Sequence, residues 1–471
     1  MLAVAAEACP KCVVNQSQAS GRPCFGVKST FEHRGVRTPG SRVEYGVCSR
    51  EPTCLYIRLD SRAYFALYCV RMFSGFSPSH AIFRFTGLRL IPNVRNSSQD
   101  SSVILTEFKS CGIITLNRPK VLNSLNLPMI RCIYPRLKKW NESASISHVI
   151  IEGTGTKAFC AGGDVRAVVD AAKAKDALAQ SFFREEYQLN HLIGTLSKPF
   201  IALLDGITMG GGVGLSVHGK YRVATENTVF AMPETALGLF PDVGGGYFLP
   251  RLKHPGLGAF LALTGQRLHG LDVVWTGVAT HYTPSDQLET LREDLCNLAF
   301  ASIQNNLDVE KVDTAITQQL KRFNQTPSIP QSIGPHLNSI AEVFALFESH
   351  KPVTVEDILR KLEAYGSAHA DNRSWADNYL KLLSRVSPTS LKVTLRQLQE
   401  GSKLSFTDNF KMEFRLSQHF VRGHDFPEGV RAILIDKDNK PKWNPSTLSA
   451  VTQELVDSYF SAIPGIVDWT P

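Results

Sequence analysis

The sequence predicts an α/β protein in which strand–strand–helix units repeat and then give way to a mainly helical C-terminal region. Short apolar runs alternate with runs at helical spacing up to about residue 252, and helical patterns follow. The chain has 471 residues, 43% hydrophobic and 20% charged, which allows two domains or one with an appendage. This composition excludes a wholly disordered, collagen-like or coiled-coil chain. No apolar run approaches the ~18–20 residues of a membrane-spanning helix, so we expect a soluble protein.

Each element is assigned, in chain order, from its periodicity and its bounding turns. Strands are predicted at residues 102–108, 111–117, 147–152, 200–204, 221–224 and 228–231. Helices are predicted at residues 127–141, 164–196 and 210–217, the last packed tightly at its glycine-rich start. A polar, proline-containing connector at 324–330 divides the helical half that follows.

The first hundred residues differ in charge from the rest. Residues 1–99 hold 13 of the 51 Lys and Arg side chains but 5 of the 43 Asp and Glu, so residues 100–471 are formally neutral. Residues 61–99 contain no acid, and arginines recur there among Phe, Ile, Leu and Ser, which is typical of a mitochondrial transit peptide. Residues 72–100 would serve as this peptide, and residues 1–71 are a doubtful leader that we expect to be disordered. A plastid or peroxisomal address and a plain disordered tail are the alternatives.

The neutral body gives no electrostatic footprint for DNA or RNA. Six of the ten cysteines lie in the first 69 residues, and the other four are scattered, as expected for reduced thiols in an intracellular protein. Cys9 and Cys12 have the spacing of half a zinc site, but no second pair at ligand spacing follows. We therefore expect no bound metal.

Two loops of small residues, each leading from a strand into a helix, carry the strongest chemical signal. They are residues 157–164 (KAFCAGGD) and 207–214 (ITMGGGVG). Small residues let a ligand approach the backbone, and the first-turn N–H groups of a helix are free donors. Two such loops together could form an oxyanion hole, which stabilises the charge that develops on a carbonyl oxygen. The motifs at 232–235 (MPET) and 240–246 (FPDVGGG) make the pattern much more specific.

These motifs resemble the crotonase (enoyl-CoA hydratase/isomerase) superfamily, and within it the branch that hydrolyses 3-hydroxyisobutyryl-CoA. The resemblance covers about residues 102–445. It is carried by residues 115–123 (TLNRPKVLN), 158–164, 183–187 (FREEY), 207–219, 230–252, 387–391 (SPTSL) and 422–443. It implies a crotonase-like spiral of β-β-α units followed by a mainly helical C-terminal region. The catalytic core is then expected at residues 101–300, with residues 301–471 completing the CoA site.

The resemblance also implies roles for individual residues. The amides of Ala161 and Gly211 would form the oxyanion hole. The CoA site would include Lys120, Leu122, Gly162 and Asp164. Substrate would contact Glu186, Gly211, Glu234 and Asp242. Of these, Glu234 is the expected nucleophile or general base, and Asp242 would orient the substrate hydroxyl or share the proton transfer.

One position departs from the hydratases of this superfamily, which carry a glutamate where this sequence has Gly214. A hydratase moves a proton to the α-carbon, so the loss of that carboxylate counts against hydration. Thioester hydrolysis needs a nucleophile or base beside an oxyanion hole, which Glu234 and the two loops provide. We expect a glutamate placed at position 214 to occupy space meant for the acyl group.

The expected activity is therefore hydrolysis of 3-hydroxyisobutyryl-CoA to 3-hydroxyisobutyrate and CoA in valine breakdown, in the mitochondrial matrix, without metal or redox cofactor. Two alternatives stay open: a non-catalytic component of the mitochondrial ribosome small subunit, and a hydratase or hydrolase of another acyl-CoA. We expect an acyl-CoA substrate, no membrane partner, and no nucleic acid unless the protein is ribosome-associated. His218, His281 and Cys160 are expected to be packing residues.

A protein that begins near Ser101 is predicted to be soluble, folded and active, because the leader contributes none of the motifs. Circular dichroism and thiol release from an acyl-CoA, measured beside the full chain, check this. If the shortened protein is insoluble or inactive while the full chain works, the leader belongs to the fold.

Overall fold

The computed structural model describes residues 43–47, 54–59, 65–69, 102–298, 308–325 and 332–471, in two compact units, Met1–Leu90 and Ile91–Pro471. In the first unit, three strands form an antiparallel sheet in chain order: β1 (Val43–Val47), β2 (Cys54–Leu59) and β3 (Phe65–Cys69). These strands differ from the expectation of a disordered leader, and their Val, Tyr, Leu and Phe content explains them. The predicted transit peptide at 72–100 and the Cys9–Cys12 pair lie outside the described residues.

The second unit contains a six-stranded sheet and a four-stranded sheet. The larger has the order β13 (His281–Tyr282), β10 (Tyr221–Ala224), β8 (Phe200–Leu204), β6 (His148–Gly153), β5 (Cys111–Leu116) and β4 (Val103–Phe108). The smaller has the order β12 (Leu268–His269), β11 (Val229–Ala231), β9 (Ile207–Met209) and β7 (Ala158–Cys160). Neighbouring strands are parallel except in the pairs β4–β5 and β11–β12.

Both faces of the larger sheet are covered, which explains its nearly continuous apolar strands. Alternation along β6 places Val149 and Ile151 in the main core and Ile150 in a smaller cluster on the other face. The smaller cluster includes residues of α9 (Ser285–Asn297) and α10 (Val309–Phe323).

The helices of the first half are α2 (Leu127–Glu142), α3 (Val165–Lys173), α4 (Leu178–Thr195) and the single turn α5 (Gly211–Gly214). The single helix predicted at 164–196 is therefore wrong, because the chain breaks between α3 and α4. Lys175 has a left-handed φ of 57°, and the Asp176 side chain accepts a hydrogen bond from the amide of Leu178 at 2.8 Å. A local side-chain bond of this kind competes with a continuous helix.

The C-terminal half is mainly helical. Besides α9 and α10, its helices among the described residues include α6 (Gly245–Phe248), α7 (Leu257–Thr264), α8 (Leu271–Trp275), α11 (Leu337–Val343), α12 (Val355–Ala368), α13 (Arg373–Leu383), α14 (Pro388–Gly401), α15 (Phe406–Arg422), α16 (Asp425–Val430), the π-helical η7 (Arg431–Ile435) and α17 (Gln453–Phe460). Two-residue strands also occur here, including β14 (Phe347–Glu348) and β15 (Lys351–Pro352), so the expectation that only helical patterns follow residue 252 is wrong. Strands this short show no periodicity in a sequence.

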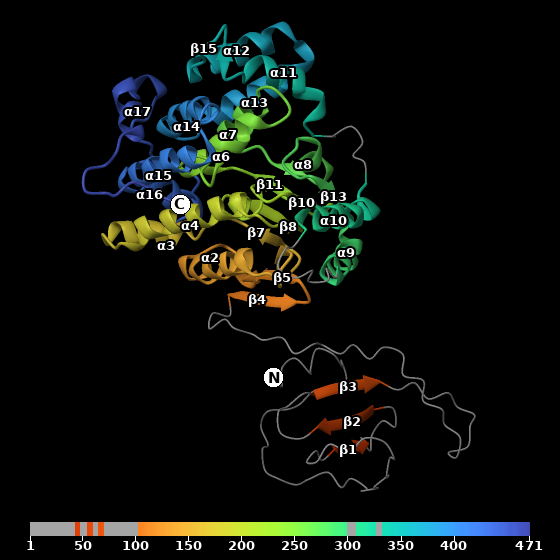
Figure 1. Cartoon of the computed structure of the whole chain (residues 1–471). Coiled ribbons are helices and arrows are strands. Elements are labelled where there is room, and N and C mark those ends of the chain that lie inside the picture. The colour runs from red at the N-terminus through yellow and green to blue at the C-terminus, as the bar shows by residue number, and fades with distance from the viewer. Residues whose placement is uncertain (1–42, 48–53, 60–64, 70–101, 299–307, 326–331) are drawn as a thin grey trace. The chain divides into compact units, whose positions relative to one another are not determined.

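Helix α15 joins the two halves, since it packs against α4, as Figure 1 shows. The C-terminal tail follows the same helix: the Trp469 indole is fully buried and donates to the carbonyl of Arg184 in α4 at 3.1 Å. Among the described residues, no helix combines the length and apolar character needed to cross a lipid bilayer. The C-terminal half is thus fixed to the helix that carries Glu186.

Gly214, at the end of α5, packs directly against α4. A Cβ atom on Gly214 would lie 2.7 Å from Cβ of Val243 and 2.8 Å from Nδ2 of Asn190. Both neighbours are fully buried. Asn190 therefore fills the space that a side chain at position 214 would need.

We predict that Gly214→Ala lowers the free energy of unfolding by roughly 1–3 kcal/mol, the usual cost of overpacking a core. Urea unfolding of the variant and the parent measures this loss. Gly423→Ala is the control, because a Cβ there would come no closer than 3.3 Å to another residue. If Gly214→Ala is as stable as the parent, Asn190 moves aside without cost.

Candidate active site

The two small-residue loops lie beside each other because β7 and β9, which precede them, are parallel neighbours. A Cβ atom on Gly211 would lie 3.2 Å from the amide nitrogen of Gly163, so the loops touch. Gly211 is the first residue of α5, and its amide therefore has no acceptor within the helix. This places a free helical N–H next to the first loop.

Ala161 does not fit the donor role predicted for it. Its amide already donates to the carbonyl of Leu122 at 3.0 Å. This bond belongs to a set of backbone hydrogen bonds, here called the zipper, that joins the loop at 117–125 to the loop at 161–164. The same zipper uses the Gly162 carbonyl and the Asp164 amide. No hydrogen bond from the Gly163 amide is found within the described residues, so this amide is available beside Gly211 where that of Ala161 is not.

Three carboxyl groups converge on these loops from separate elements. Glu186 lies on α4, Glu234 begins η3 (Glu234–Leu237), and Asp242 precedes α6. They line one cavity of about 310 Å³ together with Gly163 and Gly211. At most 5% of each of the three residues is exposed. The sequence prediction that they belong to one site agrees with this placement.

Glu186 and Glu234 are held close to the glycines of α5. A Cβ on Gly211 would meet Oε1 of Glu186 at 2.6 Å, and one on Gly210 would meet Oε1 of Glu234 at 3.0 Å. Oε1 of Glu186 and Oε2 of Glu234 have no hydrogen-bond partner among the described residues. Buried, unpaired carboxyl oxygens are costly, and they are groups that a substrate or water could engage.

Burial shifts all three carboxyls toward the protonated form, and repulsion between charges adds to the shift for Glu186 and Glu234. The pKa of Glu186 is raised well above its usual value by burial and then by the charges of Asp242 and Glu234. The pKa of Glu234 is raised by burial and by the charge of Asp242. Burial raises the pKa of Asp242 to about 7, against the hydrogen bond that Tyr187 donates to Oδ2 at 2.9 Å. The cavity thus favours the protonated form of these carboxyls more than water does.

The remaining lining combines residues that the sequence analysis does not identify. Phe182, Phe183 and Leu239 supply apolar walls, and Ile433 and Leu434 of η7 bring the C-terminal half to the cavity. Tyr187, part of the motif at 183–187, has no role predicted from the sequence, although its hydroxyl donates to Asp242. Its position one residue after Glu186 was the available signal.

The predicted CoA residues divide into exposed and structural ones. Lys120 is exposed on η2 (Pro119–Val121), and Leu122 has a left-handed φ of 55°. Gly162 lines the cavity. Asp164 caps α3 and lies 3.5 Å from the Arg118 guanidinium, which gives its carboxylate a structural role in the loop. Contact of these residues with CoA stays a prediction.

The three residues expected to be packing residues are partly or fully buried. Burial raises the pKa of the Cys160 thiol to about 12, which makes it a poor nucleophile. Burial lowers the pKa of His218 to about 4, and its Nε2 lies 2.7 Å from the Val243 carbonyl. His281 is half-buried, and burial lowers its pKa too.

Gly214 does not line the cavity. The expectation that a glutamate there would occupy the acyl space is wrong, because the position faces Asn190 and Val243. The absence of a side chain at Gly214 leaves room for the Asn190 side chain between α4 and α5.

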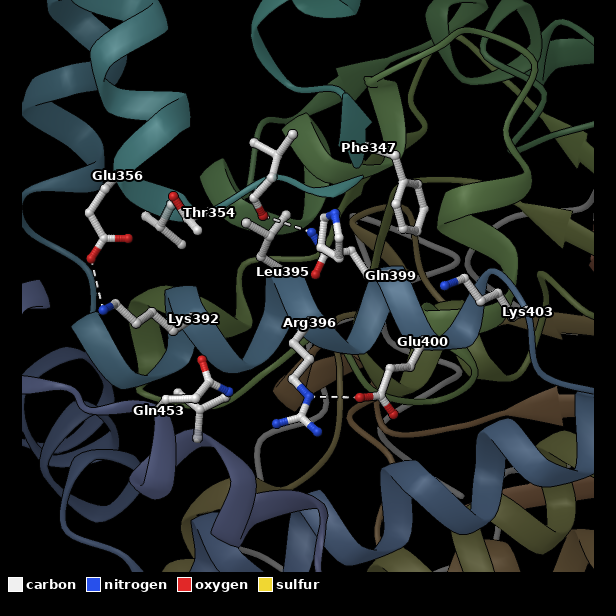
Figure 2. Close-up of a pocket in the computed structure, with 14 residues that line it drawn as sticks. Phe347, Thr354, Glu356, Lys392, Leu395, Arg396, Gln399, Glu400, Lys403 and Gln453 are labelled. Carbon is white, nitrogen blue, oxygen red and sulfur yellow. Dashed lines mark hydrogen bonds and ion pairs between the residues drawn. The ribbon is translucent and has the colours of Figure 1, made fainter. Parts of the chain in front are cut away.

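A larger hollow, of about 430 Å³, lies away from these loops between α12, α14 and α17 (Figure 2). Two of its three cations are paired with carboxylates: Lys392 Nζ lies 2.8 Å from Glu356, and Arg396 Nε lies 2.6 Å from Glu400. These two carboxylates are partly exposed, whereas the three in the smaller cavity are buried. Size alone therefore does not identify the reactive site.

Known proteins resemble this chain over most of its length. The family model for enoyl-CoA hydratase/isomerase matches residues 111–460. The chain is 50% identical to "3-hydroxyisobutyryl-CoA hydrolase, mitochondrial" of Danio rerio, over 80% of this chain and 93% of that protein. It is 51% identical to the protein of the same name from Homo sapiens, over 76% and 89%.

Solved structures give the same relationship. A carnitinyl-CoA dehydratase from Mycobacterium thermoresistibile has a TM-score of 0.68 at 34% identity, over 78% of this chain and 98% of that one. An enoyl-CoA hydratase from Rhodobacter sphaeroides has a TM-score of 0.66 at 32% identity, over 77% and 97%. The predicted crotonase-like α/β fold with a helical C-terminal region is confirmed. Because the family match spans both loops and all three buried carboxyls, this chain belongs to the enoyl-CoA hydratase/isomerase family.

Proposed function

We propose that this protein hydrolyses 3-hydroxyisobutyryl-CoA to 3-hydroxyisobutyrate and CoA, a step of valine breakdown, in the mitochondrial matrix. The observation that carries the proposal is the group of three buried carboxyls facing two free backbone donors in one small cavity. The relatives named for this activity, at about half identity over most of the chain, support the choice of substrate. Their names also include "mitochondrial".

The first requirement of thioester hydrolysis is stabilisation of the oxyanion. We place the thioester oxygen between the amides of Gly163 and Gly211. Attack on the carbonyl carbon moves negative charge onto this oxygen, and two preorganised N–H donors stabilise that charge more than they stabilise the neutral ester. The low-dielectric surroundings strengthen the effect.

The second requirement is an attacking group, which we assign to Glu234. As a general base, ionised Glu234 takes a proton from water while the water oxygen bonds to the carbonyl carbon. The intermediate then expels CoA as a thiolate, which takes the proton back from Glu234. As a nucleophile, Glu234 would instead bond to the carbonyl carbon and release CoA, and water would hydrolyse the resulting anhydride.

Asp242 and Glu186 complete the proton balance of the cavity. Because their pKa values are raised, one of them can hold a proton while Glu234 is ionised. Protonated, it can donate to the substrate hydroxyl; ionised, it can accept from that hydroxyl. The apolar walls formed by Phe182, Phe183 and Leu239 suit a short branched acyl chain.

Two other functions are separable by experiment. Release of thiol from a panel of acyl-CoA esters, measured beside hydration of an enoyl-CoA, distinguishes this hydrolase from a hydratase and from a hydrolase of another ester. Sedimentation of the native protein with or away from mitochondrial ribosomes tests the ribosomal alternative. Thiol release from 3-hydroxyisobutyryl-CoA at a rate below that of all other esters would overturn the proposed substrate.

Glu234→Gln is predicted to lower kcat by at least ~100-fold with KM largely unchanged, because it keeps shape but removes the ionisable oxygen. Thiol-release assays over a range of substrate concentrations measure kcat and KM. Glu185→Gln is the matched control, since Glu185 lies on α4 outside the cavity and pairs with Arg131. Activity of Glu234→Gln within a few-fold of the parent would eliminate the mechanism.

Asp242→Asn is predicted to move the acid limb of the kcat–pH profile to lower pH. A raised pKa means that a base becomes active only as pH rises, and the charge of Asp242 contributes to the raised pKa of Glu234. Removing that charge lets Glu234 ionise at lower pH, while burial still keeps its pKa raised. The kcat of this variant and of the parent is measured from about pH 5 to about pH 9, a range that brackets the raised carboxyl pKa values. If the acid limb of the kcat–pH profile disappears in the variant and does not move, Asp242 is the base instead of Glu234.

A further inference from the structure

The residue after Asp242 has an unusual backbone conformation. Val243 has a φ of 51°, in the left-handed region that a β-branched residue strongly disfavours. Its side chain is fully buried. Gly244, which follows, is also left-handed, with a φ of 88°. The turn that presents Asp242 to the cavity is therefore strained, and strain of this kind persists only where the surroundings impose it.

The carboxylate of Glu413 on α15 is placed to impose this conformation. It accepts hydrogen bonds from the amides of Gly244 at 2.7 Å and Gly246 at 2.8 Å. Glu413 is fully buried, and burial raises its pKa to about 8, while the two amides oppose this shift. One side chain from the C-terminal half thus binds both ends of the glycine turn.

Further contacts hold Glu413 and the other side of Asp242. Asn409 donates to Oε1 of Glu413 at 2.9 Å. Gln397 on α14 donates to the same oxygen at 3.0 Å and to the Pro241 carbonyl at 2.8 Å. The residues before and after Asp242 are therefore both tied to one buried polar network. His218 adds a contact to the Val243 carbonyl.

We propose that Glu413 is a positioning residue that holds the strained Val243 turn and thereby fixes Asp242 against the substrate. The inference rests on the proposed function, since it assigns Asp242 to the reacting site. Glu413 does not line the cavity, so it acts through the backbone and not by touching substrate. The C-terminal half then contributes to the proton chemistry as well as to the walls of the cavity.

Glu413→Gln is the first test, because its NH₂ group must face one of the two amides that the carboxylate accepts. We expect kcat for thiol release to fall by at least ~10-fold with KM within ~3-fold, as for a group that orients the reacting site. Asp272→Asn is the matched control, a carboxylate that is also buried but lies outside the cavity. It should keep the parent's kcat even if it unfolds at a lower urea concentration.

Replacement of Val243 separates strain from packing. Val243→Gly and Val243→Ala both remove the buried isopropyl group, but only glycine adopts the left-handed conformation without cost. In the Glu413→Gln background, glycine is expected to raise kcat by at least ~5-fold relative to alanine, because it removes the need for the restraint. Equal kcat values for the two double variants would overturn the proposal.

Glu413→Asp provides a second variant if Glu413→Gln does not fold. It keeps the charge but is one methylene shorter, so it cannot reach both amides, and we expect the same loss of kcat. Parental kcat in either folded variant would overturn the role of Glu413. A parent enzyme that releases no thiol from 3-hydroxyisobutyryl-CoA would instead contradict the proposed function, so the two failures are distinguishable.

Discussion

Burial of three carboxyl groups side by side is the constraint on which the rest of the site depends. Glu186, Glu234 and Asp242 are all removed from water, and burial raises the pKa of each. The charge of Asp242 further raises the pKa values of the two glutamates. Such a group is tolerated only where protons and donors offset its desolvation. The hydroxyl of Tyr187 supplies one donor, and the two glycine loops supply backbone N–H groups nearby.

The chain meets this constraint by bringing distant segments together. Parallel pairing of β7 with β9 aligns the two loops, and the zipper from Leu122 to Ala161 fixes the first loop in place. Helix α4 carries Glu186 and Tyr187, and it is packed in turn against α15. The helical half is therefore a structural part of the site, since without it the carboxyls would face water and lose their raised pKa values.

The sequence predicts those parts of this arrangement that are encoded locally. Strands such as β5 and β8 are predicted by their apolar runs. Each candidate carboxyl is predicted by the short motif that contains it. Two-residue strands carry no period, and the break between α3 and α4 depends on Asp176 bonding to the backbone two residues later. The error at Ala161 has another cause: whether an amide is free depends on Leu122, which is 39 positions away and contacts it only in the fold.

Position 214 shows how the fold changes the meaning of a missing side chain. From the sequence, the glycine indicates a lost carboxylate and, with it, a lost hydration step. In the structure, Asn190 occupies the space beside Gly214, so an amide takes the volume and no ionisable group replaces the glutamate. An amide cannot exchange protons near neutral pH, so proton transfer is left to Glu234, Asp242 and Glu186. All three lie on the cavity side of the loops, where a base is useful for activating water beside a polarised carbonyl. The packing that excludes a glutamate at 214 thus leaves the proton transfer to the three carboxyls that line the cavity.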